Sequence, residues 1–171
     1  LQADATTAAE VLACALQPAL AQEKLNQPPS GYKALFNGKD LTNWKGLVEL
    51  PQRTKLSPEQ LQEKQRVADE RMRAHWSVKE GILTFDGKGD SLQTARDYGN
   101  FELYVDWRVQ AAGDSGIYLR GNPQVQIWEA TAGSAKRADG SFIGSGGLFN
   151  NQKNPREPLV VADNPAGQWN T

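Results

Sequence analysis

The chain has 171 residues, which is the length of one domain and enough to bury a hydrophobic core. Its net charge is -1 and its pI is about 5.9, which excludes the basic surface that nucleic acids and anionic membranes require. One cysteine and one histidine exclude an internal disulfide and a zinc site of several Cys and His ligands. A divalent cation held by carboxylate and carbonyl oxygens remains open.

Residues 1–30 are predicted to be a leader and linker. Ala8 to Ala21 is mostly small and apolar, and its last three residues have the A-x-A form of a signal-peptide cleavage site. Alternatively, Val11-Leu12-Ala13-Cys14 forms a lipoprotein box with Cys14 lipidated, or the stretch is only a linker. We expect a secreted or periplasmic protein, or one anchored through Cys14. The stretch is too short and too interrupted to span a bilayer.

The folded domain is expected to cover residues 31–171, after Pro28-Pro29-Ser30-Gly31. Tyr32 to Phe36 is predicted to be a short strand, and Asn37-Gly38-Lys39-Asp40 a turn. Residues 57–75 predict one surface helix, with Ser57 as N-cap, Pro58 at the first position and Gln60 completing a capping box. A thin apolar stripe follows its helical spacing: Leu61, Ala68 and Met72. The stripe favours packing on a sheet edge, with a lid as the alternative.

The remaining periodic segments predict an antiparallel, all-β domain. Trp76 to Asp86 is expected to be a hairpin that turns at Lys79-Glu80-Gly81. Asn100 to Gln110 alternates apolar and polar residues and is the clearest predicted strand. Ser115 to Arg120 and Gln124 to Glu129 are expected to form a second hairpin around Gly121-Asn122-Pro123.

The last part of the chain predicts a long loop and then a strand. Residues 131–158 are rich in Gly, Ser and Asn, and a loop of this length is usually functional or disordered. Gln168 to Thr171 is expected to open a strand. Because a sandwich that stopped there would leave an inner edge unpaired, we expect the domain to be incomplete at its C-terminus.

The second hairpin carries the strongest candidate site. One face is expected to hold aromatic, amide and guanidinium groups: Tyr118, Arg120, Gln124, Gln126 and Trp128. Sugars stack on indoles such as Trp128 or Trp107, and their hydroxyls pair with amide and guanidinium groups. A solvated sheet face with an incidental salt bridge is the alternative.

Three titratable residues are candidates for acid–base chemistry. Asp114 precedes the hairpin and serves either as a catalyst or as a turn cap. Glu129 ends the second strand and is either an acid or base, or the partner of a cation such as Lys136 or Arg137. His75, at the predicted helix end, is either a surface residue or a base. The spacing Gln124-x-Gln126-x-x-Glu129 compares with the E-x-D-x-x-E strand of laminarinase-type glucanases, but it holds one carboxyl where a two-carboxylate glycosidase needs two.

Several spaced blocks resemble the 3-keto-disaccharide hydrolase domain family. They are GYKALFNGKDLTNW (31–44), HWSVKEGIL (75–83), FELYVDWR (101–108), DSGIYLRG (114–121) and QVQIWE (124–129), followed by residues 144–151 and GQWNT (167–171). The resemblance implies a concanavalin-like jelly-roll β-sandwich, export in many bacteria and cleavage of glycosides oxidised at C3. The helix at 57–75 is then an insertion on the sandwich.

This resemblance also implies a mechanism, in which one base removes the C2 proton, the aglycone leaves from C1 and water adds back. Asp114, Glu129 or His75 is then the base, and Arg120 or a divalent cation stabilises the enolate oxygen. The expected contacts to the glycoside or oligosaccharide substrate are Tyr118, Gln124, Gln126, Trp128, Trp107 and Asn150. A non-catalytic carbohydrate-binding module on the same sandwich remains the alternative, since it needs only stacking and amide groups.

Overall fold

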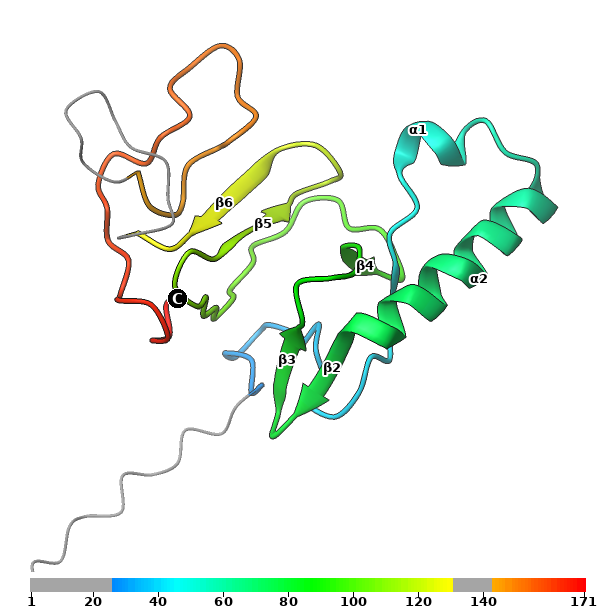
Figure 1. Ribbon diagram of the computed structural model, residues 1–171, viewed down its shortest axis with the longest axis horizontal. Coiled ribbons are helices and arrows are strands. Elements are labelled where there is room, and N and C mark those ends of the chain that lie inside the picture. The colour runs from blue at the N-terminus through cyan, green and yellow to red at the C-terminus, as the bar shows by residue number, and fades with distance from the viewer. Residues whose placement is uncertain (1–25, 131–142) are drawn as a thin grey trace, which may run out of the picture.

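The computed structural model of the protein describes residues 26–130 and 143–171 (Figure 1). The predictions for the signal peptide and Cys14, and the suggested partners Lys136 and Arg137, lie outside these residues. Within the described residues, the strands form three two-stranded antiparallel sheets. They pair β1 (Trp44–Gly46) with β4 (Leu92–Thr94), β2 (Trp76–Lys79) with β3 (Ile82–Phe85), and β5 (Asp114–Tyr118) with β6 (Gln124–Trp128). The β-rich class is confirmed.

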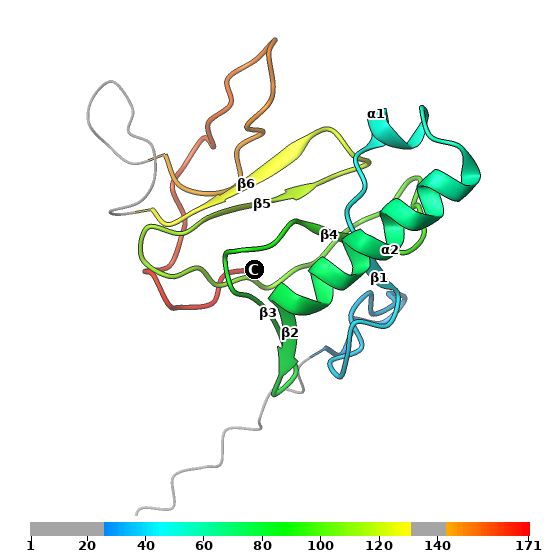
Figure 2. The same ribbon diagram turned by 45° about the vertical axis from the view of Figure 1, so that its right-hand side comes forward.

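Two helices are found in the described part of the chain, α1 (Leu50–Arg53) and α2 (Pro58–His75). Figures 1 and 2 show α2 on one side of the molecule and the β5–β6 hairpin, with the orange segment that begins at residue 143, on the other. No helix among residues 26–130 and 143–171 is long and apolar enough to cross a membrane.

Helix α2 begins where its capping residues predict. The Ser57 hydroxyl accepts the Gln60 backbone N–H at 3.3 Å, and the Gln60 side chain accepts the Ser57 N–H at 2.9 Å. Pro58 occupies the first turn, where its missing N–H costs nothing. These contacts satisfy two of the backbone donors that a helix leaves unpaired at its start.

The apolar stripe of α2 packs against β1, as predicted, and Gly46 allows the close approach. A Cβ at Gly46 would lie 2.1 Å from the carbonyl oxygen of Ala68. The Gly46 N–H donates to Asp69 Oδ1 at 2.8 Å, and the Gln65 side chain donates to the Gly46 carbonyl at 2.9 Å. Met72, in the same stripe, is buried. The helix is therefore fixed to β1 by steric fit and by hydrogen bonds.

The β2–β3 hairpin also follows its prediction. Lys79 pairs with Ile82 across a two-residue turn, in which Glu80 (φ 53°) and Gly81 (φ 77°) both take positive φ. This is the pattern of a type I′ turn, whose twist matches that of paired strands. Trp76 stacks on Phe85 at 4.6 Å between ring centroids.

Two predicted strands are wrong. Tyr32 to Phe36 forms no strand, and residues 100–110 form only one isolated bridge, from Trp107 to Asn170. Backbone N–H groups donate in both directions across that bridge at 2.9 Å. An alternating sequence shows which side chains share a face, but a strand also needs a neighbour along its backbone. Phe101 and Tyr104 are accordingly exposed.

Tyr32 connects the start of the domain to this extended segment. Its hydroxyl donates to Glu102 Oε2, and its ring meets Tyr104 edge-on at 5.1 Å. The hydrogen bond to Glu102 is the main cause that raises the pKa of Tyr32 from its usual value to about 12.

This contact predicts a late-titrating phenol. Because the folded pKa is raised, the contact contributes stability below about pH 10, and this contribution is lost as the pH rises through about 12. An ultraviolet titration should show one of the four tyrosines ionising near pH 12, and Tyr32→Phe should remove that step. If Tyr32→Phe removed a titration step near pH 10 instead, Tyr32 would not be hydrogen-bonded to Glu102 as described.

Candidate functional site

The register of the β5–β6 hairpin divides its side chains between two faces. Residues directly opposite each other in an antiparallel pair point to the same face. Asp114 pairs with Trp128, Gly116 with Gln126, and Tyr118 with Gln124. The other face carries Ser115, Ile117, Val125 and Ile127. The predicted grouping of Tyr118 with Gln124, Gln126 and Trp128 is therefore confirmed.

A third stretch of backbone lies along the free side of β6. The Gln126 N–H donates to the Gly147 carbonyl at 2.9 Å, and the Phe149 N–H donates to the Gln124 carbonyl at 3.1 Å. In this register Phe149 shares the face of Gln124, and its ring meets Trp128 edge-on at 5.6 Å. We call Asp114, Tyr118, Gln124, Gln126, Trp128 and Phe149 the hairpin face.

A chain of hydrogen bonds runs across the hairpin face and ends on a carboxylate. Gln124 Nε2 donates to Gln126 Oε1 at 3.1 Å, and Gln126 Nε2 donates to Asp114 Oδ1 at 2.6 Å. Gln126 is 3% exposed, so its amide is fixed between its neighbours. Gly116 leaves the space that the Gln124 amide fills, since a Cβ there would lie 2.3 Å from Gln124 Nε2. Asp114 is thus an oriented and exposed carboxyl group.

The loop after residue 143 is tied to the end of β6 through Ser145. The Trp128 N–H donates to Ser145 Oγ at 3.0 Å, and that hydroxyl donates to the Trp128 carbonyl at 3.1 Å. The Ser145 N–H donates in turn to Asp163 Oδ2 at 3.0 Å. Asp163 and Phe149 were not predicted. The Gly- and Asn-rich run from 144 to 151 was the available signal for Phe149, but a loop sequence does not reveal which strand it lies along.

Glu129 lies just past β6 and has a different environment from Asp114. Its backbone N–H donates to the Gly113 carbonyl at 2.9 Å, and Oε2 accepts the Ala112 N–H at 3.5 Å. Glu129 is only 2% exposed. In this arrangement its carboxyl group supports the turn before β5 and is closed to solvent.

Arg120 is not on the hairpin face, contrary to the prediction. Arg120 (φ 53°) and Gly121 (φ 84°) are the two central residues of the tight turn, which the Asn122 N–H closes onto the Leu119 carbonyl at 3.3 Å. Strand β5 therefore ends at Tyr118, two residues earlier than predicted. Arg120 lies six positions beyond Asp114, which is roughly 20 Å along an extended strand.

Asn150 has a structural role at the same end of the hairpin. Its Oδ1 accepts the Gln124 backbone N–H at 3.0 Å, and its Nδ2 donates to the carbonyl and the side chain of Asn122. Both ends of the Asn150 amide are therefore hydrogen-bonded within the protein, and they stabilise the turn. Its predicted contact with substrate remains untested.

Trp107 and His75 lie on other elements. Trp107 belongs to the extended segment and forms the bridge to Asn170. His75 ends α2, and its Nδ1 lies 3.0 Å from Asp86 Oδ2, just after β3. This contact is the main cause that lowers the pKa of Asp86. Neither residue has a polar contact with the hairpin face.

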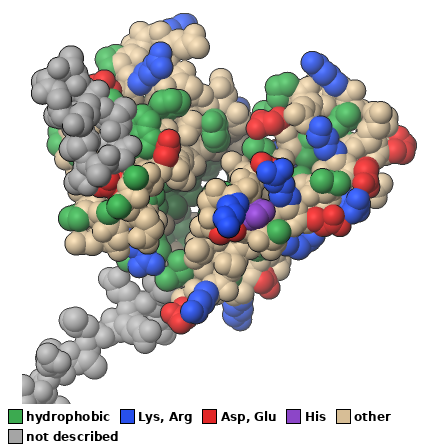
Figure 3. Space-filling view, in the orientation of Figure 1, with side chains coloured by type: hydrophobic (Ala, Val, Ile, Leu, Met, Phe, Trp, Pro, Cys, Tyr) green, Lys and Arg blue, Asp and Glu red, His purple; other side chains and the backbone are tan. Residues whose placement is uncertain are grey.

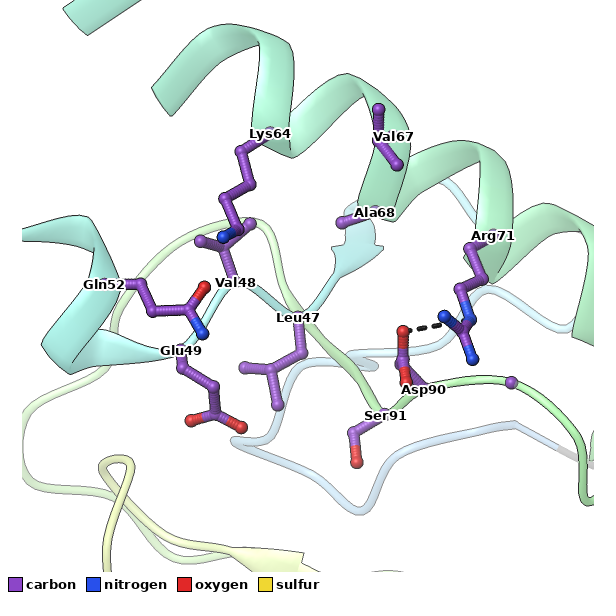
Figure 4. Close-up of a pocket in the computed structure, with 11 residues that line it drawn as sticks. Leu47, Val48, Glu49, Gln52, Lys64, Val67, Ala68, Arg71, Asp90 and Ser91 are labelled. Atoms are coloured by element: carbon purple, nitrogen blue, oxygen red, sulfur yellow. Dashed lines mark ion pairs between the residues drawn. The ribbon is translucent and has the colours of Figure 1, made fainter. Parts of the chain in front are cut away.

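Two cavities flank α2. The first has a volume of about 520 Å³ and lies between α1, α2 and residues 89–91. Arg71 and Asp90 pair at 3.1 Å in its wall (Figure 4). Figure 3 shows acidic and basic side chains interspersed on the side of the molecule that carries α2. The second has a volume of about 620 Å³ and lies beside β2 and residues 39–44. Neither is lined by the hairpin face. For the chemistry we favour the hairpin face. The first cavity is lined by no aromatic side chain and its Arg71 is already paired with Asp90. The single carboxylate of the second, Asp40, is a poor base, because hydrogen bonds from Thr42 and Asn37 lower its pKa to about 2. No group of three or more His, Cys, Asp or Glu side chains that could hold a metal occurs in the described ranges.

Comparison with known proteins confirms the family resemblance that the sequence blocks indicate. A family model described as a 3-keto-alpha-glucoside-1,2-lyase-like domain matches residues 31–171. A 3-keto-disaccharide hydrolase of Bacteroides thetaiotaomicron is 27% identical over 97 residues, which cover 52% of this chain and 27% of that protein. The chain thus spans about a quarter of this relative.

A solved structure shares the fold. The crystal structure of a putative glycosyl hydrolase from Parabacteroides distasonis matches with a TM-score of 0.56 and 21% sequence identity. The match covers 84% of this chain and 66% of that one, so the chain spans just under two thirds of it. Since the family model covers most of the sequence, the chain belongs to the 3-keto-alpha-glucoside-1,2-lyase-like domain family.

Proposed function

We propose that this domain cleaves glycosides already oxidised at C3 of the sugar, on a concanavalin-like jelly-roll sandwich. Family membership and the name of the Bacteroides relative support the substrate class. The observation that carries the chemistry is the hydrogen-bond chain from Gln124 through Gln126 to Asp114. It presents one oriented carboxylate beside aromatic side chains, and the proposed reaction needs one base.

The reaction proceeds by elimination and hydration. Asp114 removes the proton at C2, which the C3 ketone makes acidic, and the electron pair is held as an enolate on the C3 oxygen. The enolate then expels the aglycone from C1, which leaves a double bond between C1 and C2, and the aglycone takes up a proton. Water adds to C1 of this enone and a proton returns to C2, which gives the free 3-keto sugar.

Asp114 is favoured as the base over the other two candidates. Glu129 is almost fully buried and supports a turn, and His75 contacts Asp86 at the far end of α2. Asp114 is exposed and has one oxygen positioned by Gln126.

The enolate needs a hydrogen-bond donor, and Arg120 lies in the turn, six positions beyond Asp114. Gln124 Nε2 gives one of its two N–H groups to Gln126, and the second is available to a substrate oxygen. We assign the enolate contact to Gln124. The rings of Trp128 and Phe149 then provide stacking surface for the sugar and the aglycone.

Selectivity for the oxidised sugar tests this function. The protein is incubated with a chromogenic 3-keto-β-glucoside and, in parallel, with the same glucoside before oxidation. Release from only the keto substrate is expected, because the C2 proton of the unoxidised sugar is not acidic. A parallel assay with chelator determines whether a divalent cation assists Gln124.

A non-catalytic carbohydrate-binding module is the second candidate. It is favoured by Gln124, an amide that cannot act as a base, and by the rings of Trp128 and Phe149 on the same face, since stacking and amide groups are all that such a module needs. Saturable binding of sugar without release from either chromogenic substrate would replace the proposed enzyme with this function.

A further inference from the structure

The second cavity beside α2 has the lining of a sugar site, and it is separate from the hairpin face. It is lined by Trp44 of β1, Met72 and Arg73 at the end of α2, and Trp76 of β2, together with Lys39 and Asp40 of the preceding turn. Ligand sites usually combine apolar and aromatic walls with a few convergent polar groups. A volume of about 620 Å³ accommodates one or two sugar rings.

The indole N–H groups of Trp44 and Trp76 differ in their hydrogen bonding. Trp76 is held by stacking on Phe85 and by donating its N–H to the Asp90 carbonyl at 2.9 Å. The N–H of Trp44 is buried and has no acceptor among the described residues. Because this N–H is closed to solvent, Trp44 can offer a ligand in the cavity only the rest of its side chain.

The charges of the lining favour an anion. Arg66 and Arg71, on the same helix, form ion pairs with Glu63, Glu70 and Asp90, whereas Arg73 has no ion pair within the described ranges. Lys39 is likewise without one there. The single carboxylate of the lining, Asp40, already accepts hydrogen bonds from the Thr42 N–H at 2.9 Å and from Asn37 Nδ2 at 2.7 Å. The hydrogen bond from the Thr42 side chain, which has the largest effect, and these two bonds lower the pKa of Asp40 to about 2. Asp40 is therefore ionised, and the lining carries the two cations Lys39 and Arg73 against this one anion.

We propose that this cavity binds an anionic sugar, a ring that carries a carboxylate or a sulfate. Arg73 and Lys39 bind the acid group, and the Trp44 and Trp76 indoles contact the ring. The first cavity lacks this combination, since it is lined by no aromatic side chain and its Arg71 is already paired with Asp90. The proposed site is independent of the cleavage reaction.

Binding is measured by tryptophan fluorescence and by calorimetry with three probes: a glucuronate oligosaccharide, a sulfated gluco-oligosaccharide and the neutral gluco-oligosaccharide. We expect an acidic probe to bind and the neutral one to bind at least about tenfold more weakly, with the acidic affinity falling as salt is raised. The stronger of the two acidic probes identifies the acid group.

Substitutions locate the site. Arg73→Gln and Lys39→Gln should each weaken the acidic probe about tenfold, and Arg73→Lys should retain most of the affinity. Lys79→Gln, which removes an exposed cation of β2 outside the lining, is the matched control and should bind as the wild type. Equal binding of acidic and neutral probes, no binding of either acidic probe, or wild-type affinity in Arg73→Gln would overturn the proposal. Arg73→Gln should still cleave a 3-keto-glucoside, so a failure here is distinct from a failure of the proposed enzyme.

Discussion

Asp114→Asn is expected to lower kcat for a 3-keto-glucoside by about 10²–10⁴-fold, the usual contribution of a positioned base. An amide cannot accept the C2 proton. The substitution preserves the shape of the side chain, and its oxygen can still accept the Gln126 N–H that now donates at 2.6 Å. The folded structure should therefore persist, and substrate binding should change much less than kcat.

A matched variant separates this effect from a general change in charge. Asp97→Asn removes another exposed carboxylate, one outside the hairpin face, and should leave kcat unchanged. Steady-state kinetics with the chromogenic 3-keto-glucoside would measure both variants. Full activity in a folded Asp114→Asn protein would exclude Asp114 as the base and return the role to Glu129 or His75.

Gly46→Ala is expected to destabilise the protein by about 3 kcal/mol, at the upper end of the range for overpacking. The added Cβ would lie 2.1 Å from the Ala68 carbonyl oxygen, and backbone atoms of a helix cannot rotate away as a side chain can. Displacing α2 would also strain the hydrogen bonds that Gly46 makes with Asp69 and Gln65. Urea unfolding would measure the change in midpoint and slope.

Gly99→Ala provides the control for this prediction. Gly99 has nothing within 4 Å of a built Cβ, so the same chemical change there meets open space. Its midpoint should stay within experimental error of the wild type or rise slightly, since alanine restricts the unfolded chain. If the two variants unfold at the same urea concentration, the docking of α2 on β1 is not as close as described.

The elements that sequence predicted well are those specified by neighbouring residues. Ser57, Pro58 and Gln60 define the start of α2 within one turn of chain, and Glu80-Gly81 defines the turn of the β2–β3 hairpin. The pairing of Tyr118 with Gln124 likewise needs only a short turn between them. In each case the physical signal and its consequence lie within a few residues.

The errors concern contacts between distant parts of the chain. Residues 100–110 have the alternation of a strand, but the structure gives them one isolated bridge, from Trp107 to Asn170, and a further backbone hydrogen bond from the Gly167 N–H to the Val109 carbonyl. Phe149 joins the hairpin face because residues 146–149 lie along β6, which no local pattern indicates. The position of Arg120 was predicted wrongly for a local reason. The sequence allows the turn at either of two places, and the structure forms it at Arg120-Gly121 and not at the predicted Gly121-Asn122-Pro123.

The central claim, cleavage through loss of the C2 proton, is tested most directly by a competition between substrates. A 3-keto-β-glucoside with hydrogen at C2 is mixed with the same compound carrying deuterium there, and the substrate left after partial conversion is analysed. Elimination predicts that the remaining substrate is enriched in deuterium, because the C2–H bond breaks before the aglycone leaves. Conversion without enrichment, to a 3-keto sugar that keeps all of its C2 deuterium, would show that the C2–H bond is never broken and would contradict the proposed mechanism.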